Sequence, residues 1–180
     1  TELDPVALRW ARGLVEANPA LAGRIECRFQ ASATECCEGV VEPGETFAAS
    51  ICNPPFHTSR EEAAAGSLRK LRNLGGGRMP AKVLNFGGKG SELWCPGGEL
   101  GFVRRMIAQS ARRPGTCLWF TTLVSKAAHL PGLRRALKEV RAVGEEIEMV
   151  HGQKKSRILA WSFLPAQERR ARLERIRDRP

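Results

Sequence analysis

The chain has 180 residues, enough for one domain with a buried core, and carries 29 Lys and Arg against 19 Asp and Glu. The net charge of +10 and pI near 10 indicate a polyanionic partner, although a basic surface that only aids solubility has the same composition. No apolar run is long enough to cross a bilayer, so we expect no membrane span. The first residues do not read as a signal peptide, and we expect none.

The cysteines bear on metal binding and on location. No two of the six are spaced as Cys-x-x-Cys, which argues against a zinc site, and most stand in apolar, strand-like contexts. We therefore expect no metal. Unpaired thiols of this kind are typical of a reduced, cytoplasmic protein, and we expect a monomer. The six are Cys27, Cys36, Cys37, Cys52, Cys95 and Cys117.

Helical and strand-like patterns alternate along the chain. The first helix begins with Asp4 as N-cap and Pro5 in the first position, and ends at Asn18–Pro19. Strands are expected at 24–29, 47–52 and 116–124, helices at 59–72, 99–112 and 133–143, and a glycine-rich loop at 73–98. The final strands, 146–151 and 158–163, are expected to pair antiparallel. This alternation predicts an α/β domain whose sheet is mainly parallel, followed by an Arg-rich helix or tail over 166–180.

The most informative segment is Asn53–Phe56, which reads Asn-Pro-Pro-Phe directly after the apolar run 47–52. Two consecutive prolines fix the backbone and remove two N–H donors, which leaves a rigid rim of carbonyl acceptors. The Asn53 side-chain oxygen and the Pro54 carbonyl can each accept one N–H, while Phe56 stacks on a ring. A planar group with an exocyclic amine fits this arrangement. His57 follows directly, and is either a proton acceptor or a contact at the start of a helix.

Asn53–Phe56 resembles the [Asn/Asp/Ser]-Pro-Pro-[Tyr/Phe/Trp] motif of S-adenosylmethionine (SAM)-dependent methyltransferases that act on exocyclic or amide nitrogens. Further segments extend the likeness to bacterial enzymes that N6-methylate an adenosine of 23S ribosomal RNA, and more distantly to eukaryotic RNA adenine methyltransferases. These segments are Asn85–Gly88, Glu92–Cys95, Gly97–Glu99, Trp119–Lys126 and Gln153–Arg157. The resemblance covers residues 1–165 and implies a Rossmann-like class I methyltransferase sheet. It implies catalytic roles for Asn53, Pro54, Pro55 and Phe56, with 23S rRNA or a large-subunit assembly intermediate as partner.

The resemblance also implies where the cofactor binds. Glu2, at the end of a strand, matches the position that accepts from the SAM ribose hydroxyls, although it also suits a helix start. Ser32 lies near the expected adenine site, and Asn53 would approach the cofactor as well. The family places its first strand and glycine loop before Glu2, so we expect residues 1–165 to be the C-terminal part of a methyltransferase domain and to bind SAM weakly alone.

Basic residues near the expected ligand edge are candidates for RNA contact, with solvated helix faces as the alternative. They are Arg69, Lys70, Lys89, Lys126, Lys154, Lys155 and Arg157. The Arg-rich segment 166–180 is either an RNA-binding arm or a solvated helix. Three other functions remain open: a protein glutamine N5-methyltransferase, a non-catalytic RNA-binding fragment and a DNA adenine methyltransferase.

Overall fold

The computed structural model describes residues 1–64, 93–151 and 154–178. The chain divides into two compact units, Thr1–Glu45 and Thr46–Pro180. The sequence patterns did not predict this division. In the described part of the chain, no helix is both long and apolar enough to cross a membrane, and no group of three or more His, Cys, Asp or Glu side chains is arranged to hold a metal ion.

The first unit contains helix α1 (Pro5–Glu16), which begins as the sequence predicted. The Asp4 side chain accepts a hydrogen bond from the Val6 amide at 3.0 Å, which satisfies one of the donors left open at a helix start. The strand expected at 24–29 is wrong. Only a single parallel bridge forms, between Glu2 and Phe29. The Arg28 guanidinium instead closes the loop by pairing with Glu26 and Glu45.

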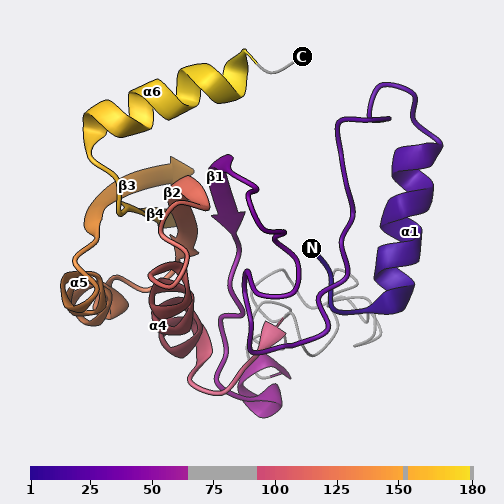
Figure 1. The fold of residues 1–180 in the computed structure, drawn as a ribbon. Coiled ribbons are helices and arrows are strands. Elements are labelled where there is room, and N and C mark those ends of the chain that lie inside the picture. The colour runs from indigo at the N-terminus through magenta and orange to yellow at the C-terminus, as the bar shows by residue number, and fades with distance from the viewer. Residues whose placement is uncertain (65–92, 152–153, 179–180) are drawn as a thin grey trace. The chain divides into compact units, whose positions relative to one another are not determined.

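The second unit is built on a four-stranded mixed sheet with the order β1-β2-β4-β3 (Figure 1). β1 (Phe47–Cys52) runs parallel to β2 (Cys117–Val124). β4 (Lys154–Ser162) pairs antiparallel with both β2 and β3 (Val143–His151). The antiparallel final pair is confirmed, although β3 and β4 both begin earlier than the sequence predicted.

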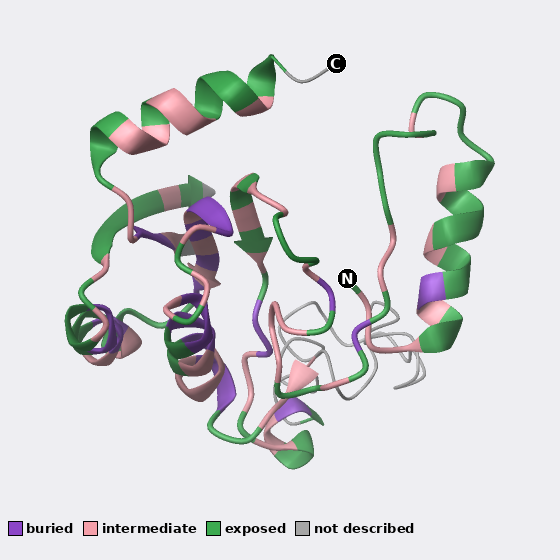
Figure 2. Cartoon of the chain, viewed as in Figure 1, coloured by how far each residue is buried: buried purple, intermediate pink, exposed green. Residues whose placement is uncertain are grey.

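Helices α4 (Gly98–Ser110) and α5 (Leu130–Glu139) pack against each other, and a short 3-10 turn, η2 (Ala127–His129), leads into α5. The predicted helix 99–112 is confirmed within two residues, whereas α5 lies about one turn before the expected 133–143. Both helices contain several buried residues, drawn in purple in Figure 2. The core side chains include Val103, Ile107, Leu133, Phe120, Leu159 and Trp161.

Helix α6 (Ala166–Arg177) has no buried residue and contacts β1 and β2 near the end of the sheet at which β1 begins (Figures 1 and 2). The Arg169 guanidinium lies 4.2 Å from the centre of the Trp119 ring. Arg172 forms an ion pair with Glu168 one turn earlier. Arg169 and Arg172 therefore make contacts within the molecule.

Candidate functional site

Asn53–Phe56 directly follows β1, so the sheet sets the position of the motif. Pro54 and Pro55 are buried, Asn53 is exposed and Phe56 is half-buried. The prolines thus anchor the segment, and the amide of Asn53 stays accessible from solvent. That this segment binds a planar amine stays a prediction from the sequence.

The segment after the motif is held by backbone and side-chain hydrogen bonds. The His57 amide donates to the Leu93 carbonyl and the Cys95 amide donates to the His57 carbonyl, both at 3.1 Å. The Glu62 carboxylate accepts from the Thr58 amide at 2.8 Å and from the Thr58 hydroxyl at 2.6 Å. The segment that follows the motif is therefore held both by the backbone of Leu93 and Cys95 and by the Glu62 side chain.

The Glu62 carboxylate is the charged centre of this segment. Hydrogen bonds from the Thr58 hydroxyl and amide lower its pKa to about 2. Nδ1 of His57 is buried 3.8 Å from Oε1 of Glu62, and has no hydrogen-bond partner in the part of the chain that the structure describes. Nζ of Lys126 also lies 3.8 Å from Oε1 of Glu62. Glu62 thus links the segment after β1 to the lysine that follows β2.

A second carboxylate, that of Glu99, lies in the first turn of α4 and is buried. It accepts from the Ser125 amide and from the Ser125 hydroxyl, both at 2.5 Å. Nδ1 of His129 lies 3.2 Å from Oε2 of Glu99, an ion pair when the imidazole is protonated. Ser125 directly follows β2, so Glu99 holds the chain where that strand ends.

The sequence patterns assigned no role to Glu62 or Glu99. For Glu62 a signal was present, because Ser59-x-x-Glu62 has the spacing of a capping box. In the structure, the Glu62 amide donates a hydrogen bond to Oγ of Ser59 at 3.2 Å, as in such a box. For Glu99 the sequence shows only an acid in a first helical turn, which is usually solvent-exposed. Its burial depends on Ser125, 26 residues further along the chain.

The predicted cofactor residues lie in both units: Glu2 and Ser32 in the first, Asn53 in the second. Oε1 of Glu2 accepts from the amides of Leu3 and Asp4 at 2.7 and 2.8 Å, which fixes the direction of the side chain. The Ser32 amide donates to Oε1 of the buried Gln30 at 2.9 Å, and the hydroxyl of the half-buried Ser32 lies 3.0 Å from the Thr34 hydroxyl.

The predicted RNA-contact residues are described only in part. Arg69, Lys70 and Lys89 lie outside the described residues. Lys126 is 53% exposed. Arg157 is only 17% exposed and lies 3.7 Å from Glu148, so little of its guanidinium faces solvent.

Lys154 and Lys155 begin β4, in the hairpin that joins it to β3. Because Arg157 pairs with Val124, the last residue of β2, the first residues of β4 extend beyond the carboxyl end of β2. The two lysines therefore lie at the same end of the sheet as Asn53.

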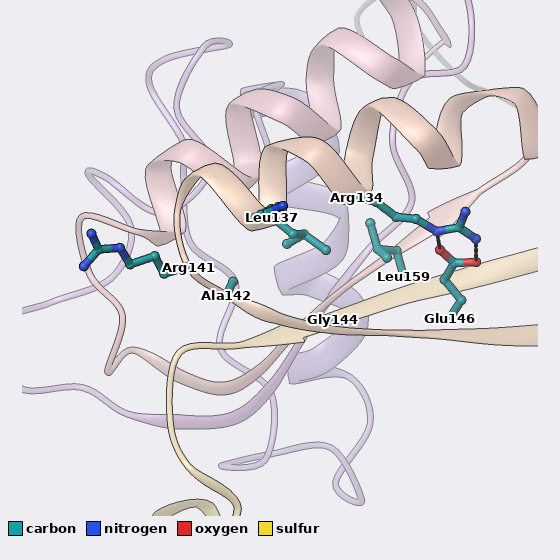
Figure 3. Close-up of a pocket in the computed structure, with 8 residues that line it drawn as sticks. Arg134, Leu137, Arg141, Ala142, Gly144, Glu146 and Leu159 are labelled. Carbon is teal, nitrogen blue, oxygen red and sulfur yellow. Dashed lines mark hydrogen bonds and ion pairs between the residues drawn. The ribbon is translucent and has the colours of Figure 1, made fainter.

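A separate hollow of about 530 Å³ lies between α5 and β3 (Figure 3). Arg134 and Glu146 form a bidentate ion pair across it at 2.6 and 2.8 Å. Gly144 lets α5 approach the sheet closely, because a Cβ at this position would lie 2.6 Å from Cδ1 of Leu137. None of the predicted site residues lines this hollow.

Comparison with known proteins identifies the family. A family model described as "RNA methyltransferase" matches residues 1–165. The chain belongs to this RNA methyltransferase family. It is 45% identical over 181 residues to ribosomal RNA large subunit methyltransferase F of Photobacterium profundum, covering 91% of this chain and 54% of that relative. The protein of the same name from Pseudomonas putida is 48% identical over 174 residues, covering 95% and 55%. The chain thus spans about half the length of these curated relatives.

Solved structures agree with this assignment. The chain resembles the hMettl16 catalytic domain solved with the MAT2A 3'UTR hairpin 1, with a TM-score of 0.73 and 26% identity over 92% of this chain and 55% of that one. The N-terminal domain of human METTL16 solved with SAH shares the fold, with a TM-score of 0.62 and 23% identity over 91% of this chain and 51% of that one. The Rossmann-like class I methyltransferase fold and the family predicted from the sequence are therefore confirmed.

Proposed function

We propose that the protein transfers a methyl group from SAM to the N6 amine of an adenosine in 23S rRNA. The observation that carries this proposal is the motif: an exposed Asn53 beside two buried prolines at the end of β1, in a chain of the RNA methyltransferase family. The similarity to relatives named ribosomal RNA large subunit methyltransferase F supports rRNA as the substrate. Such a substrate implies that the protein works in the cytoplasm.

The N6 lone pair of adenine is delocalised into the ring, so the amine is a poor nucleophile. The Asn53 side chain and the Pro54 carbonyl would each accept a hydrogen bond from one N6–H, which directs the lone pair out of the ring plane; one of these protons is released to solvent once the amine is methylated. Phe56 would stack on the extruded base, and base–aromatic stacking is worth ~1–3 kcal/mol against the few kcal/mol lost on unstacking. Positioning of this kind supplies much of the rate when two reactants are held at attack distance.

The cofactor, when bound, supplies an electrophilic methyl group. Glu2 suits a ribose diol, because Leu3 and Asp4 amides fix the carboxylate through Oε1 alone and Oε2 remains an acceptor. The Ser32 hydroxyl, which lies 3.0 Å from the Thr34 hydroxyl, is the candidate for a contact near the adenine, and Asn53 would approach the cofactor as its motif implies. These three residues are our candidates for holding SAM.

The rRNA backbone would be neutralised by basic side chains around the carboxyl end of the sheet. Lys126, Lys154 and Lys155 are the strongest candidates by position, whereas Arg157 is largely engaged with Glu148. Each phosphate contact would strengthen binding at low salt and lose its effect at high salt. Arg69, Lys70 and Lys89 remain candidates from the sequence alone.

The test is methyl transfer by the complete protein from labelled SAM to unmodified 23S rRNA, with wild type beside Asn53→Ala. Loss of one positioned hydrogen-bond acceptor is expected to lower kcat by about 10²–10³-fold. Asn18→Ala, which changes an exposed asparagine after α1, is the matched control and should retain wild-type activity. If wild type places no methyl on adenine N6, the proposed reaction is wrong. If Asn53→Ala matches wild type, the assignment of the site is wrong.

A further inference from the structure

The buried carboxylate of Glu99 stands apart from the other acidic residues in the described ranges. Its side chain is fully inaccessible to solvent, whereas the Glu62 side chain is 36% exposed and that of Glu168, in the first turn of α6, is 43% exposed. An acid in a first helical turn stabilises the helix dipole from an exposed position just as well. Burial adds a desolvation cost that helix stability does not require. The carboxylate therefore serves a contact that only the buried position provides.

The contacts are with the residue after β2 and with His129, whose Nδ1 lies 3.2 Å from Oε2. Both carboxylate oxygens of Glu99 are used, one by the Ser125 amide and the other by the Ser125 hydroxyl. Hydrogen bonds to an ionised acceptor are shorter and stronger than neutral ones, and two of them fix both position and orientation. The next residue is Lys126, whose ammonium group reaches toward Glu62.

The same turn of α4 also touches the segment that leaves the motif. A Cβ on Gly98 would lie 3.0 Å from Cγ2 of Thr58 and 3.3 Å from the carbonyl carbon of His57, so these backbones approach closely. The start of α4 thus contacts the chain after β1 through Gly98 and the chain after β2 through Glu99. It ties together the ends of two neighbouring parallel strands, where ligands bind in open α/β sheets.

We propose that Glu99 is a positioning residue: its buried carboxylate fixes the Ser125 turn and so holds Lys126 beside the segment that follows Asn53–Phe56, where the ammonium group receives an RNA phosphate. This inference rests on the proposed function. Glu99 touches neither base nor cofactor in this scheme. It acts through Ser125 on the placement of one cation.

The experiment is a kinetic double-mutant cycle in the complete protein, with Glu99→Gln, Lys126→Ala and the double variant. Glutamine keeps the shape of the side chain but replaces one carboxylate oxygen by an NH2 group, so the Ser125 hydroxyl loses its acceptor and can only turn to accept a weaker, neutral hydrogen bond. Each single variant should raise KM for RNA about tenfold, as expected for one phosphate contact, and leave kcat within about threefold of wild type. The double variant should be no worse than Lys126→Ala alone, since both changes remove the same contact.

Glu168→Gln is the matched control, because Glu168 is also a first-turn acid but has a side chain that is 43% exposed; it should leave KM for RNA unchanged. Ser125→Ala serves if Glu99→Gln does not fold, since it removes one hydrogen bond at an exposed residue and should raise KM for RNA in the same direction. Additive effects in the cycle, or a wild-type KM for RNA in Ser125→Ala, would overturn the proposal. If the wild-type protein transfers no methyl group to RNA, the proposed function is wrong, and the role proposed for Glu99 falls with it.

Discussion

The two ends of β2 are held in different ways. At its carboxyl end, the chain is fixed by directional polar contacts: two hydrogen bonds to the buried Glu99, and a cation that approaches Glu62. Toward its amino end, the contacts are aromatic. Phe120 and Trp161 stack with ring centres 5.8 Å apart, and the Trp161 indole donates to Oγ of Ser110 at 2.9 Å.

This difference between the two ends of β2 separates contacts that position side chains from contacts that stabilise the fold. Directional contacts fix where a few atoms lie, and one substitution breaks them. Ring packing contributes more to the free energy of folding and tolerates small shifts. We therefore expect the loss of a polar side-chain contact at the carboxyl end mainly to alter activity, and the loss of ring packing toward the amino end mainly to alter stability, with little effect on the activity of the folded protein.

The largest loss of stability is expected from Gly98→Ala, at the carboxyl end. Gly98 has φ +54°, and an added Cβ would meet the backbone of His57 and Thr58. We expect a loss of about 3 kcal/mol in the free energy of unfolding, from backbone strain and crowding together. Urea denaturation measures it. Gly132→Ala in α5, where a Cβ makes only ordinary contact, should be neutral or slightly stabilising.

Trp161→Phe probes the amino end. The indole is fully buried, so the smaller ring leaves a cavity and removes the hydrogen bond to Ser110, at a cost of about 2 kcal/mol. The kcat of the folded variant should match wild type. Trp10→Phe is the control, because Trp10 is 73% exposed and its replacement should change stability by less than ~0.5 kcal/mol. A lowered kcat in Trp161→Phe with the fold intact would contradict the division of roles.

The substitution Thr58→Val tests the hydrogen bond between Thr58 and Glu62 through the pKa of Glu62 and the pH dependence of stability. The Thr58 hydroxyl is the main reason that the pKa of Glu62 is about 2 instead of the usual 4.5. A folded-state pKa below the unfolded value stabilises the protein above pH ~4.5, and the contribution is lost as the pH falls toward ~2. In Thr58→Val the NMR-measured pKa of Glu62 should rise toward 4.5, and the loss of stability over this pH range should shrink.

Glu146 provides an internal control for that titration. Its pKa is lowered by Arg134 on α5 and does not involve Thr58. Its titration should therefore be the same in both proteins. An unchanged pKa at Glu62 would mean that the hydroxyl does not hold the carboxylate.

The smallest effect is expected from Arg169→Ala in α6. The guanidinium above Trp119 is worth about 0.5–1 kcal/mol at an accessible site. A fall in Tm of a few degrees with unchanged methyl transfer is expected. Arg170→Ala, next to it and exposed, should leave Tm unchanged. A large loss of RNA binding in Arg169→Ala would instead favour α6 as an RNA-binding arm.

Much of the fold followed from local patterns, because capping residues and apolar periodicity act within a few residues. The start of α1 at Pro5 and the motif at the end of β1 are examples. The strand expected at 24–29 failed for the opposite reason. Ile25, Cys27 and Phe29 alternate as in a strand, but a strand needs a paired neighbour, and only Phe29 has one.

The candidate site also has a part that local sequence predicts and a part that it does not. The motif could be predicted because its chemistry lies in four adjacent residues. The role of Glu99 could not, since the burial of its carboxylate arises from a contact with a distant turn. A buried acid cannot be told from an exposed one in a first helical turn until the partner is known.

The two prolines after β1 have one more consequence. Pairing between β1 and β2 ends at Cys52 and Thr122, although β2 continues to Val124. Pro54 and Pro55 have no N–H to donate, so β1 cannot lengthen along its neighbour at these positions. The length of the strand is thus limited by covalent structure: a change in packing around the motif can add at most Asn53 to the ladder, which cannot continue through Pro54 and Pro55.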